Sequence, residues 1–251
     1  MPTRLDAKIR TVASWALQTK SSRIALLIAS FGFFLALPSL GAGLHTLDDP
    51  DQQRLIEAHL RGQRAPVQPW WDLYNLVNGD RSEAEVAIHN WARPWWTAPT
   101  VKIQFFRPVA VATLYLDRVL FGQRYWLAHL HSALWYFALC YLVSLVLHRL
   151  STQRSAATMA ALLFAVDDAH SAPISWLAGR NAIVAATFLA LALLLYDQAG
   201  RTDRLRFALG SAFTFLLALL SAENVISGAP LFAFYSLLLD RRALRARLAS
   251  V

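Results

Sequence analysis

The segment Trp126–Leu147, WLAHLHSALWYFALCYLVSLVL, decides the class of this protein. It contains no Asp, Glu, Lys or Arg. About 20 predominantly apolar residues, wound as an α-helix, cross the roughly 30 Å hydrocarbon core of a bilayer. The segment therefore predicts a membrane-spanning helix.

The rest of the chain has a matching composition. Hydrophobic residues make up 56% of its 251 residues and charged residues 16%, whereas soluble domains carry about 25% charged residues. Because further apolar runs occur on both sides of the first, we predict an all-α fold: a polytopic transmembrane helix bundle of about six spans. The other five runs are Ile24–Gly43, Ala156–Val166, Ile174–Tyr196, Leu205–Leu220 and Val225–Leu239. Ala156–Val166 is too short to cross the bilayer by itself, so its helix must either extend into flanking residues or end inside the protein.

Basic residues gather on one side of this topology. Residues 1–23, 148–155, 197–206 and 240–251 hold fourteen basic and four acidic residues, net +10, and the remainder is net −2. The positive-inside rule makes that side cytoplasmic. The overall charge of +8 then follows from topology and indicates no nucleic-acid partner. The predicted division is a basic cytoplasmic N-terminus (1–23), a transmembrane region (24–240) and a basic cytoplasmic tail (241–251).

The long segment Leu44–Gln104 becomes an outer loop with short amphipathic helices. One is expected from Asp49 as N-cap to Gly62 as stop, and a second opens at the capping box Ser82–Glu85. The loop also holds five tryptophans, which indicate either an interfacial aromatic belt or stacking on a sugar or lipid headgroup. They are Trp70, Trp71, Trp91, Trp95 and Trp96.

The helical segment Phe106–Phe121 is expected to lie on the outer surface. If it spanned the membrane, every later span would invert and three basic clusters would face outward. It also carries Arg107, Asp117 and Arg118. These charges favour an amphipathic interfacial helix.

Charged residues far apart in sequence fall at the outer face in this topology. Asp48 and Asp49 follow the outer end of the first span, and Asp49 has a structural explanation as a helix cap, so Asp48 is the better catalytic candidate. Arg180 lies inside the fourth span, where a guanidinium requires an anionic partner. That partner is either a phosphate or a carboxylate of Asp167 or Asp168.

The turn between the third and fourth spans suggests a metal site. Asp167, Asp168 and His170 offer three potential ligands for a divalent cation, Mg²⁺ or Mn²⁺. The alternative is that the aspartates only cap the helix that follows. Glu223, between the last two spans, is expected to be a network partner, and His129 is expected to form hydrogen bonds and to line the site.

Short motifs occur in a fixed order along this region: Phe106-Arg107-Pro108, Leu116-Asp117, Leu120–Gly122, Trp126–His131, His170, Trp176–Asn181 and Ala222–Asn224. Together they resemble polytopic glycosyltransferases of the C fold, GT-C. Many members of that family read His-Pro-x-His where this chain has Asp167–His170. The resemblance covers most of Ile24–Asp240.

The resemblance implies transfer of a sugar from a polyprenyl-phosphate donor to a glycan, lipid or protein acceptor, outside a bacterial inner (plasma) membrane. It implies a general base at the outer end of the first span, hence Asp48 or Asp49. Arg180 would bind the leaving phosphate with help from His170. Arg107, His129 and Glu223 would complete the substrate site. Because members often have eight or more spans, it also implies that this chain is truncated.

Two other classes remain open. A transporter would place polar residues near the membrane midplane, usually in internal repeats, and the chain has no such repeat. A non-catalytic membrane scaffold, or a truncated pseudoenzyme, would need no carboxylate at the end of the first span.

Overall fold

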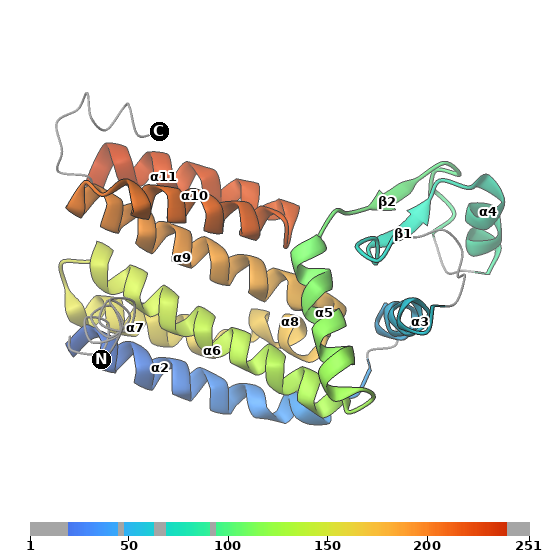
Figure 1. Ribbon diagram of the computed structural model, residues 1–251, viewed down its shortest axis with the longest axis horizontal. Helices are drawn as coiled ribbons and strands as arrows, with labels where there is room; N and C mark the ends of the chain where they lie inside the picture. Colours follow the sequence, from blue (N-terminus) through green and yellow to red (C-terminus); the bar gives the residue numbers. More distant parts are fainter. Residues whose placement is uncertain (1–19, 45–47, 63–68, 91–93, 240–251) are drawn as a thin grey trace, which may run out of the picture.

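Parallel and antiparallel helices build one bundle (Figure 1). The computed structural model describes residues 20–44, 48–62, 69–90 and 94–239. Helix α6 is central, because α2, α7 and α9 all pack on it, and α10 packs on α9. The bundle helices are α2 (Lys20–Ala36), α6 (Tyr125–Leu150), α7 (Arg154–Val166), α9 (Asn181–Thr202) and α10 (Leu205–Leu219). Shorter pieces join or follow them: η1 (Leu37–Gly41), η2 (Asp168–His170), α8 (Ser171–Ser175), η3 (Ala178–Arg180), η4 (Glu223–Gly228), α11 (Ala229–Phe234) and the π-helical η5 (Tyr235–Leu239).

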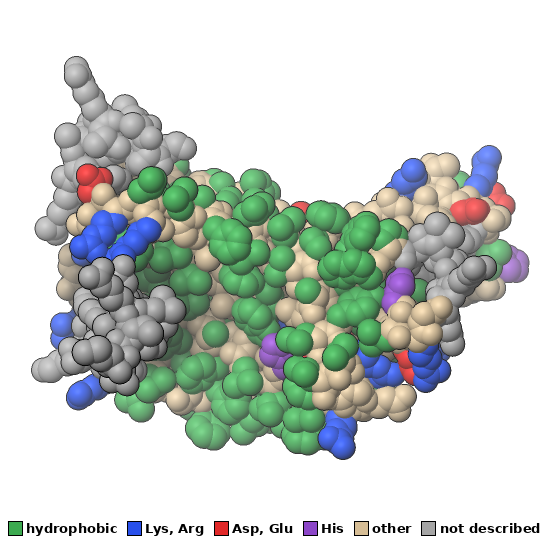
Figure 2. Space-filling view, viewed as in Figure 1, with side chains coloured by type: hydrophobic (Ala, Val, Ile, Leu, Met, Phe, Trp, Pro, Cys, Tyr) green, Lys and Arg blue, Asp and Glu red, His purple; other side chains and the backbone are tan. Residues whose placement is uncertain are grey.

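Among the residues that the structure describes, three helices are long and apolar enough to cross a membrane: Ser21–Gly41, Tyr125–Leu150 and Ala178–Thr202. The helices α7 and α10 are apolar but shorter; the former, at 1.5 Å per residue, is only about 20 Å long. The sixth expected run is divided among η4, α11 and η5. A mostly helical fold with possible membrane spans is thus confirmed, while the count of six stays a prediction. Figure 2 shows hydrophobic side chains over the middle of the molecule and most charged ones toward its two ends.

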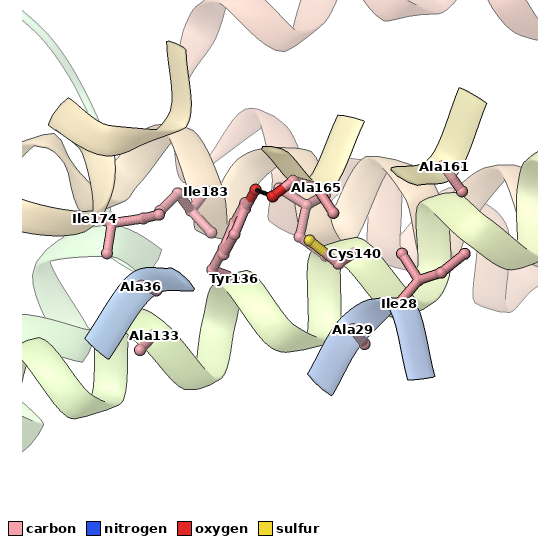
Figure 3. Packing of buried hydrophobic residues seen from close by; sticks show 11 residues of the cluster. Ile28, Ala29, Ala36, Ala133, Tyr136, Cys140, Ala161, Ala165, Ile174 and Ile183 are labelled. Atoms are coloured by element: carbon pink, nitrogen blue, oxygen red, sulfur yellow. Dashed lines mark hydrogen bonds between the residues drawn. The ribbon is translucent and has the colours of Figure 1, made fainter. Parts of the chain in front are cut away.

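Small residues let the bundle helices approach closely. Figure 3 shows Ile28 and Ala29 of α2 facing α6, and Tyr136 donating a hydrogen bond to the Ala165 carbonyl of α7 at 3.0 Å. A Cβ at Gly32 would lie 3.1 Å from the Cys140 Sγ. The contact between α2 and α6 therefore depends on a residue without a side chain.

The outer loop corrects the all-α prediction. Strands β1 (Asn75–Asn78) and β2 (Lys102–Gln104) pair antiparallel, with Asn75 opposite Gln104 and Val77 opposite Ile103. Strands of three or four residues leave too little alternation in a sequence to be recognised. Pairing between such distant segments is decided by the tertiary structure.

The loop contains both expected short helices, but with different first turns. Helix α3 (Asp49–Leu60) has Asp48 at its N-cap position, with Asp49 already helical. Helix α4 (Arg81–His89) begins before the expected capping box, because the Asp80 carboxylate accepts the Ser82 backbone N–H at 2.7 Å. Trp91 lies outside the described residues.

Helix α5 (Pro108–Phe121) occupies the segment for which we expected a surface helix. It runs crosswise at one end of the bundle (Figure 1) and contacts α3, α6 and α9. Its position along a membrane surface stays a prediction.

The predicted orientation can be tested by cysteine labelling. In a Cys140→Ala background, which removes the single buried thiol, an exposed residue is replaced at each end of the bundle. We expect a membrane-impermeant maleimide to label Ser82→Cys in intact cells, and Thr152→Cys only after permeabilisation. Labelling in the reverse order would overturn the topology and the location of the site.

Candidate functional site

The predicted site residues lie on segments that meet at the α5 end of the bundle. There α2 has ended in η1, α6 and α9 begin, and α10 gives way to η4 (Figure 1). Helix α8 contacts both η1 and α9, and η4 contacts α9. The topology therefore gathers these segments, and the side-chain contacts decide which residues form a site.

Arg180 is enclosed by the protein, with a side chain 1% exposed. Its Nη1 forms an ion pair with the Asp117 Oδ2, its Nε donates to the Ser132 Oγ at 2.8 Å, and its Nη2 donates to the Ala128 carbonyl at 2.6 Å. The expectation of an ion pair with Asp167 or Asp168 is wrong, because the guanidinium points toward α5 and α6. These contacts satisfy the buried charge without a ligand.

Asp117 also joins a second chain of hydrogen bonds. The His131 Nδ1 donates to the Asp117 Oδ1 at 2.5 Å, and the Trp135 indole N–H donates to the His131 Nε2 at 3.0 Å. Since an indole nitrogen can only donate, the His131 Nε2 is the acceptor of this hydrogen bond. The network ties α5 to α6 and to the start of α9.

Asp49 is a structural carboxylate. It is buried, and it accepts the backbone N–H groups of Leu177 at 3.3 Å and Ala178 at 2.7 Å. These N–H groups belong to the turn before α9, so Asp49 anchors α3 to that turn. The sequence predicted a structural role for Asp49 as the N-cap of its own helix. The structural role is confirmed, but the N-cap position is wrong, because Asp48 occupies it.

Asp48 acts electrostatically on a tyrosine, Tyr74, that the sequence did not single out. Tyr74 is buried and donates a hydrogen bond from its hydroxyl to the Ala178 carbonyl at 2.7 Å. Burial raises the pKa of Tyr74 well above its usual value; Arg107 and Arg180 act to lower it, and Asp49 and Asp48 act to raise it. All four charged groups are thus within electrostatic reach of one phenol. Asp48 itself is partly exposed.

Arg107 and Glu223 form a bidentate ion pair at this end. The Arg107 Nε donates to the Glu223 Oε2 at 2.9 Å, and its Nη2 donates to the Oε1 at 2.6 Å. The guanidinium also lies over the rings of Phe105 and Tyr74, 4.2 and 4.8 Å from their centroids. The hydrogen bonds that Arg107 donates to Glu223 hold the pKa of this carboxyl below its usual range. Glu223 is a network partner, as the sequence indicated.

The exposure of this pair distinguishes it from the Arg180 network. The Arg107 side chain is 14% exposed and that of Glu223 is 51% exposed. Asn181, with its amide oriented to donate to the Gly179 and Ala178 carbonyls, accepts from the Arg107 Nη1 at 3.2 Å. Protein contacts therefore fix the position of the Arg107 guanidinium, while its partner carboxylate, Glu223, is exposed at the surface.

The turn at Asp167–His170 does not assemble the expected metal ligands. Asp167 accepts the Ala169 N–H at 3.0 Å, and the His170 Nδ1 lies 3.2 Å from the Asp167 carbonyl and 3.4 Å from the Tyr136 hydroxyl. Among the residues that the structure describes, no three His, Cys, Asp or Glu side chains are arranged to hold a metal ion. The expectation of a Mg²⁺ or Mn²⁺ site at Asp167 and Asp168 is therefore corrected, and the capping alternative fits Asp167.

His129 links two elements. It is fully buried, and its Nε2 donates to the Gly43 carbonyl at 2.6 Å, because a carbonyl can only accept. The expected hydrogen-bonding role is confirmed. With no exposed surface, His129 supports the end of the first span from within the protein.

Comparison with known proteins gives no match: no family model, no curated protein and no solved structure resembles this chain closely enough. The function must therefore be argued from the residues at this end of the bundle.

Proposed function

We propose that this protein is an integral-membrane glycosyltransferase of about six spans, which transfers a sugar from a polyprenyl-phosphate donor to an acceptor at the α5 end of its bundle. In this proposal Asp48 is the general base toward the acceptor hydroxyl. Arg107, rather than Arg180, binds the donor phosphate. The order of the sequence motifs and the three long apolar helices support the membrane setting and the donor class.

The observation that carries the proposal is a chain of contacts: Glu223 pairs with Arg107, Arg107 lies over the Tyr74 ring, and Tyr74 and Asp49, the neighbour of Asp48, both bond Ala178. Inverting transfer by direct displacement needs a carboxylate near the acceptor and a positive charge on the leaving phosphate. Asp48 and Arg107 supply these two charges at the same end of an apolar bundle. Asp49, the neighbour of Asp48, accepts the Ala178 N–H, the Tyr74 hydroxyl donates to the Ala178 carbonyl, and Arg107 lies over the Tyr74 ring, which supports one shared site.

Glu223 explains how Arg107 would accept a phosphate. The carboxylate engages two N–H groups of the guanidinium, and a phosphate matches the same planar fork. Because Glu223 is half exposed, it can turn to solvent at little cost when a phosphate arrives. Arg180 has no comparable freedom, since moving it would strand Asp117 in the interior.

A non-catalytic membrane scaffold is the second candidate. The internal neutralisation of the charges favours it: Asp49 is engaged by backbone N–H groups, Arg180 by Asp117 and Arg107 by Glu223. A protein with this role would bind neither donor nor acceptor.

Binding of a short-chain polyprenyl phosphate tests the proposal directly. We expect Arg107→Lys to weaken binding roughly tenfold, since losing a hydrogen bond to a charged group costs about 1.5 kcal/mol. Equilibrium titration of the full chain in detergent measures this. The control is Arg124→Lys, at an exposed position between α5 and α6, which should bind normally.

Two results would contradict this assignment. If Arg107→Lys binds normally while a folded Arg180→Lys protein binds weakly, the phosphate belongs to Arg180. If the unmodified protein does not bind the polyprenyl phosphate, the scaffold candidate is favoured.

A further inference from the structure

A cavity lies at the opposite end of the bundle, away from the candidate site. It has a volume of about 360 Å³ and lies between α6, α9 and the α11–η5 segment. Its walls are mostly apolar, and Val146, Leu193, Leu231 and Phe234 contribute to them. Pockets of this size hold small molecules in many proteins. Figure 2 shows the surface hollowed beside the Lys and Arg side chains at this end.

A charged network borders the apolar cavity. Asp197 has a side chain only 3% exposed, and its Oδ2 accepts from the Arg149 Nη1 at 2.9 Å. Its Oδ1 accepts from the Arg201 Nε at 2.8 Å and from the Tyr235 hydroxyl. Arg149, Asp197 and Tyr235 all line the cavity. Arg149 and Arg201 thus both contact the Asp197 carboxylate.

The two arginines are reachable from outside. The Arg149 side chain is 25% exposed and that of Arg201 is 57% exposed. A ligand that fits this site combines an anionic head for the arginines with a hydrocarbon part for the cavity. Basic pockets between membrane helices on the cytoplasmic side bind anionic lipid headgroups in this way.

We propose that this cavity binds an anionic phospholipid of the cytoplasmic leaflet, with its phosphate at Arg149 and Arg201 and part of one acyl chain against Val146 and Leu231. The basic clusters place this end on the cytoplasmic side, where anionic lipids are enriched. The two partly exposed arginines and the apolar walls together favour a phospholipid over a free phosphate. The site does not depend on the transferase reaction.

Titration of the full chain in detergent with two phospholipids of identical acyl chains tests the proposal. We expect phosphatidylglycerol to bind roughly fivefold or more tightly than phosphatidylcholine, a ratio that corresponds to the contribution of one arginine near a lipid headgroup. Native mass spectrometry counts the bound lipids. Inorganic phosphate is titrated as a separate arm and should not displace phosphatidylglycerol.

Three variants locate the binding. Arg149→Gln should remove the preference for phosphatidylglycerol. Val146→Phe, which fills the cavity and leaves the charges in place, should weaken binding of both lipids, so the proposal stays testable if Arg149→Gln fails to fold. Arg154→Gln, an exposed arginine at the same end, should bind normally.

Other outcomes would overturn the proposal. Equal binding of both lipids, or unchanged binding in Arg149→Gln and Val146→Phe, would exclude a phospholipid at this site. Displacement by inorganic phosphate would indicate a simple anion site. A crosslink from Val146→Cys to residues 240–251 in lipid-free protein would show that the chain itself occupies the cavity.

Discussion

Replacing Asp48 by Asn should lower sugar transfer by about 10²–10⁴-fold, the usual contribution of a general base. Asn keeps the volume and much of the hydrogen bonding of Asp but cannot accept the proton of the acceptor hydroxyl. Binding of polyprenyl phosphate should persist, because in the proposed site Arg107 and not Asp48 contacts the phosphate. The measurement is transfer of labelled sugar in membranes, with binding titrated in parallel.

The matched control for this variant is Asp51→Asn. Asp51 lies on the same helix, three residues further on, and its exposed carboxylate pairs with Arg54. It should transfer sugar normally. Unchanged transfer in Asp48→Asn would move the base to Asp49 or to the Asp167–Asp168 pair. Unchanged transfer in all of these single variants would favour the scaffold candidate.

Replacing Asp117 by Leu should lower the free energy of unfolding by about 3–5 kcal/mol, because it leaves the Arg180 guanidinium buried without its partner. Both side chains of this pair are at least 95% buried. The same change removes the acceptor of the His131 Nδ1–H. Denaturant unfolding in detergent, followed by tryptophan fluorescence, measures the loss.

A double variant separates lost pairing from lost packing. Asp117→Leu with Arg180→Met replaces the ion pair by an apolar pair, and such replacements are often neutral or stabilising. It should recover most of the lost stability. Glu85→Gln, which breaks the exposed Arg81–Glu85 pair, should change stability by less than about 1 kcal/mol. A stable Asp117→Leu single variant would contradict the structural role of Arg180 and reopen it as a ligand for phosphate.

The sequence predicted the helices well where apolar runs were long. The helices α2, α6 and α9 overlap three of the six runs, with ends that differ by up to seven residues, since length and hydropathy are properties of a continuous segment. It failed where the signal was short. The strands β1 and β2 have four and three residues, and the start of α4 depends on which of two neighbouring polar side chains accepts one N–H.

The sequence predicted the location of the candidate site better than it predicted which residues form the site. Asp48, Arg107 and Glu223 were named from the sequence, and they lie at the α5 end with Tyr74. Tyr74 carried no signal, since a tyrosine in a loop has many ordinary roles. Asp117 did carry one, because it and Arg118 are the charged residues of a mostly apolar helix, and such a carboxylate is a candidate partner for Arg180.

The sequence by itself determined the mostly helical class, the apolar runs behind the three long helices of the described residues, and the end of the bundle at which the candidate residues lie. These follow from segment length, hydropathy and the alternation of antiparallel helices. Only the tertiary structure decided which oppositely charged side chains form ion pairs. Arg180 pairs with Asp117, 63 positions away, and Arg107 pairs with Glu223, 116 positions away. These pairings depend on the distances between side chains of packed segments, and no local sequence pattern predicts them.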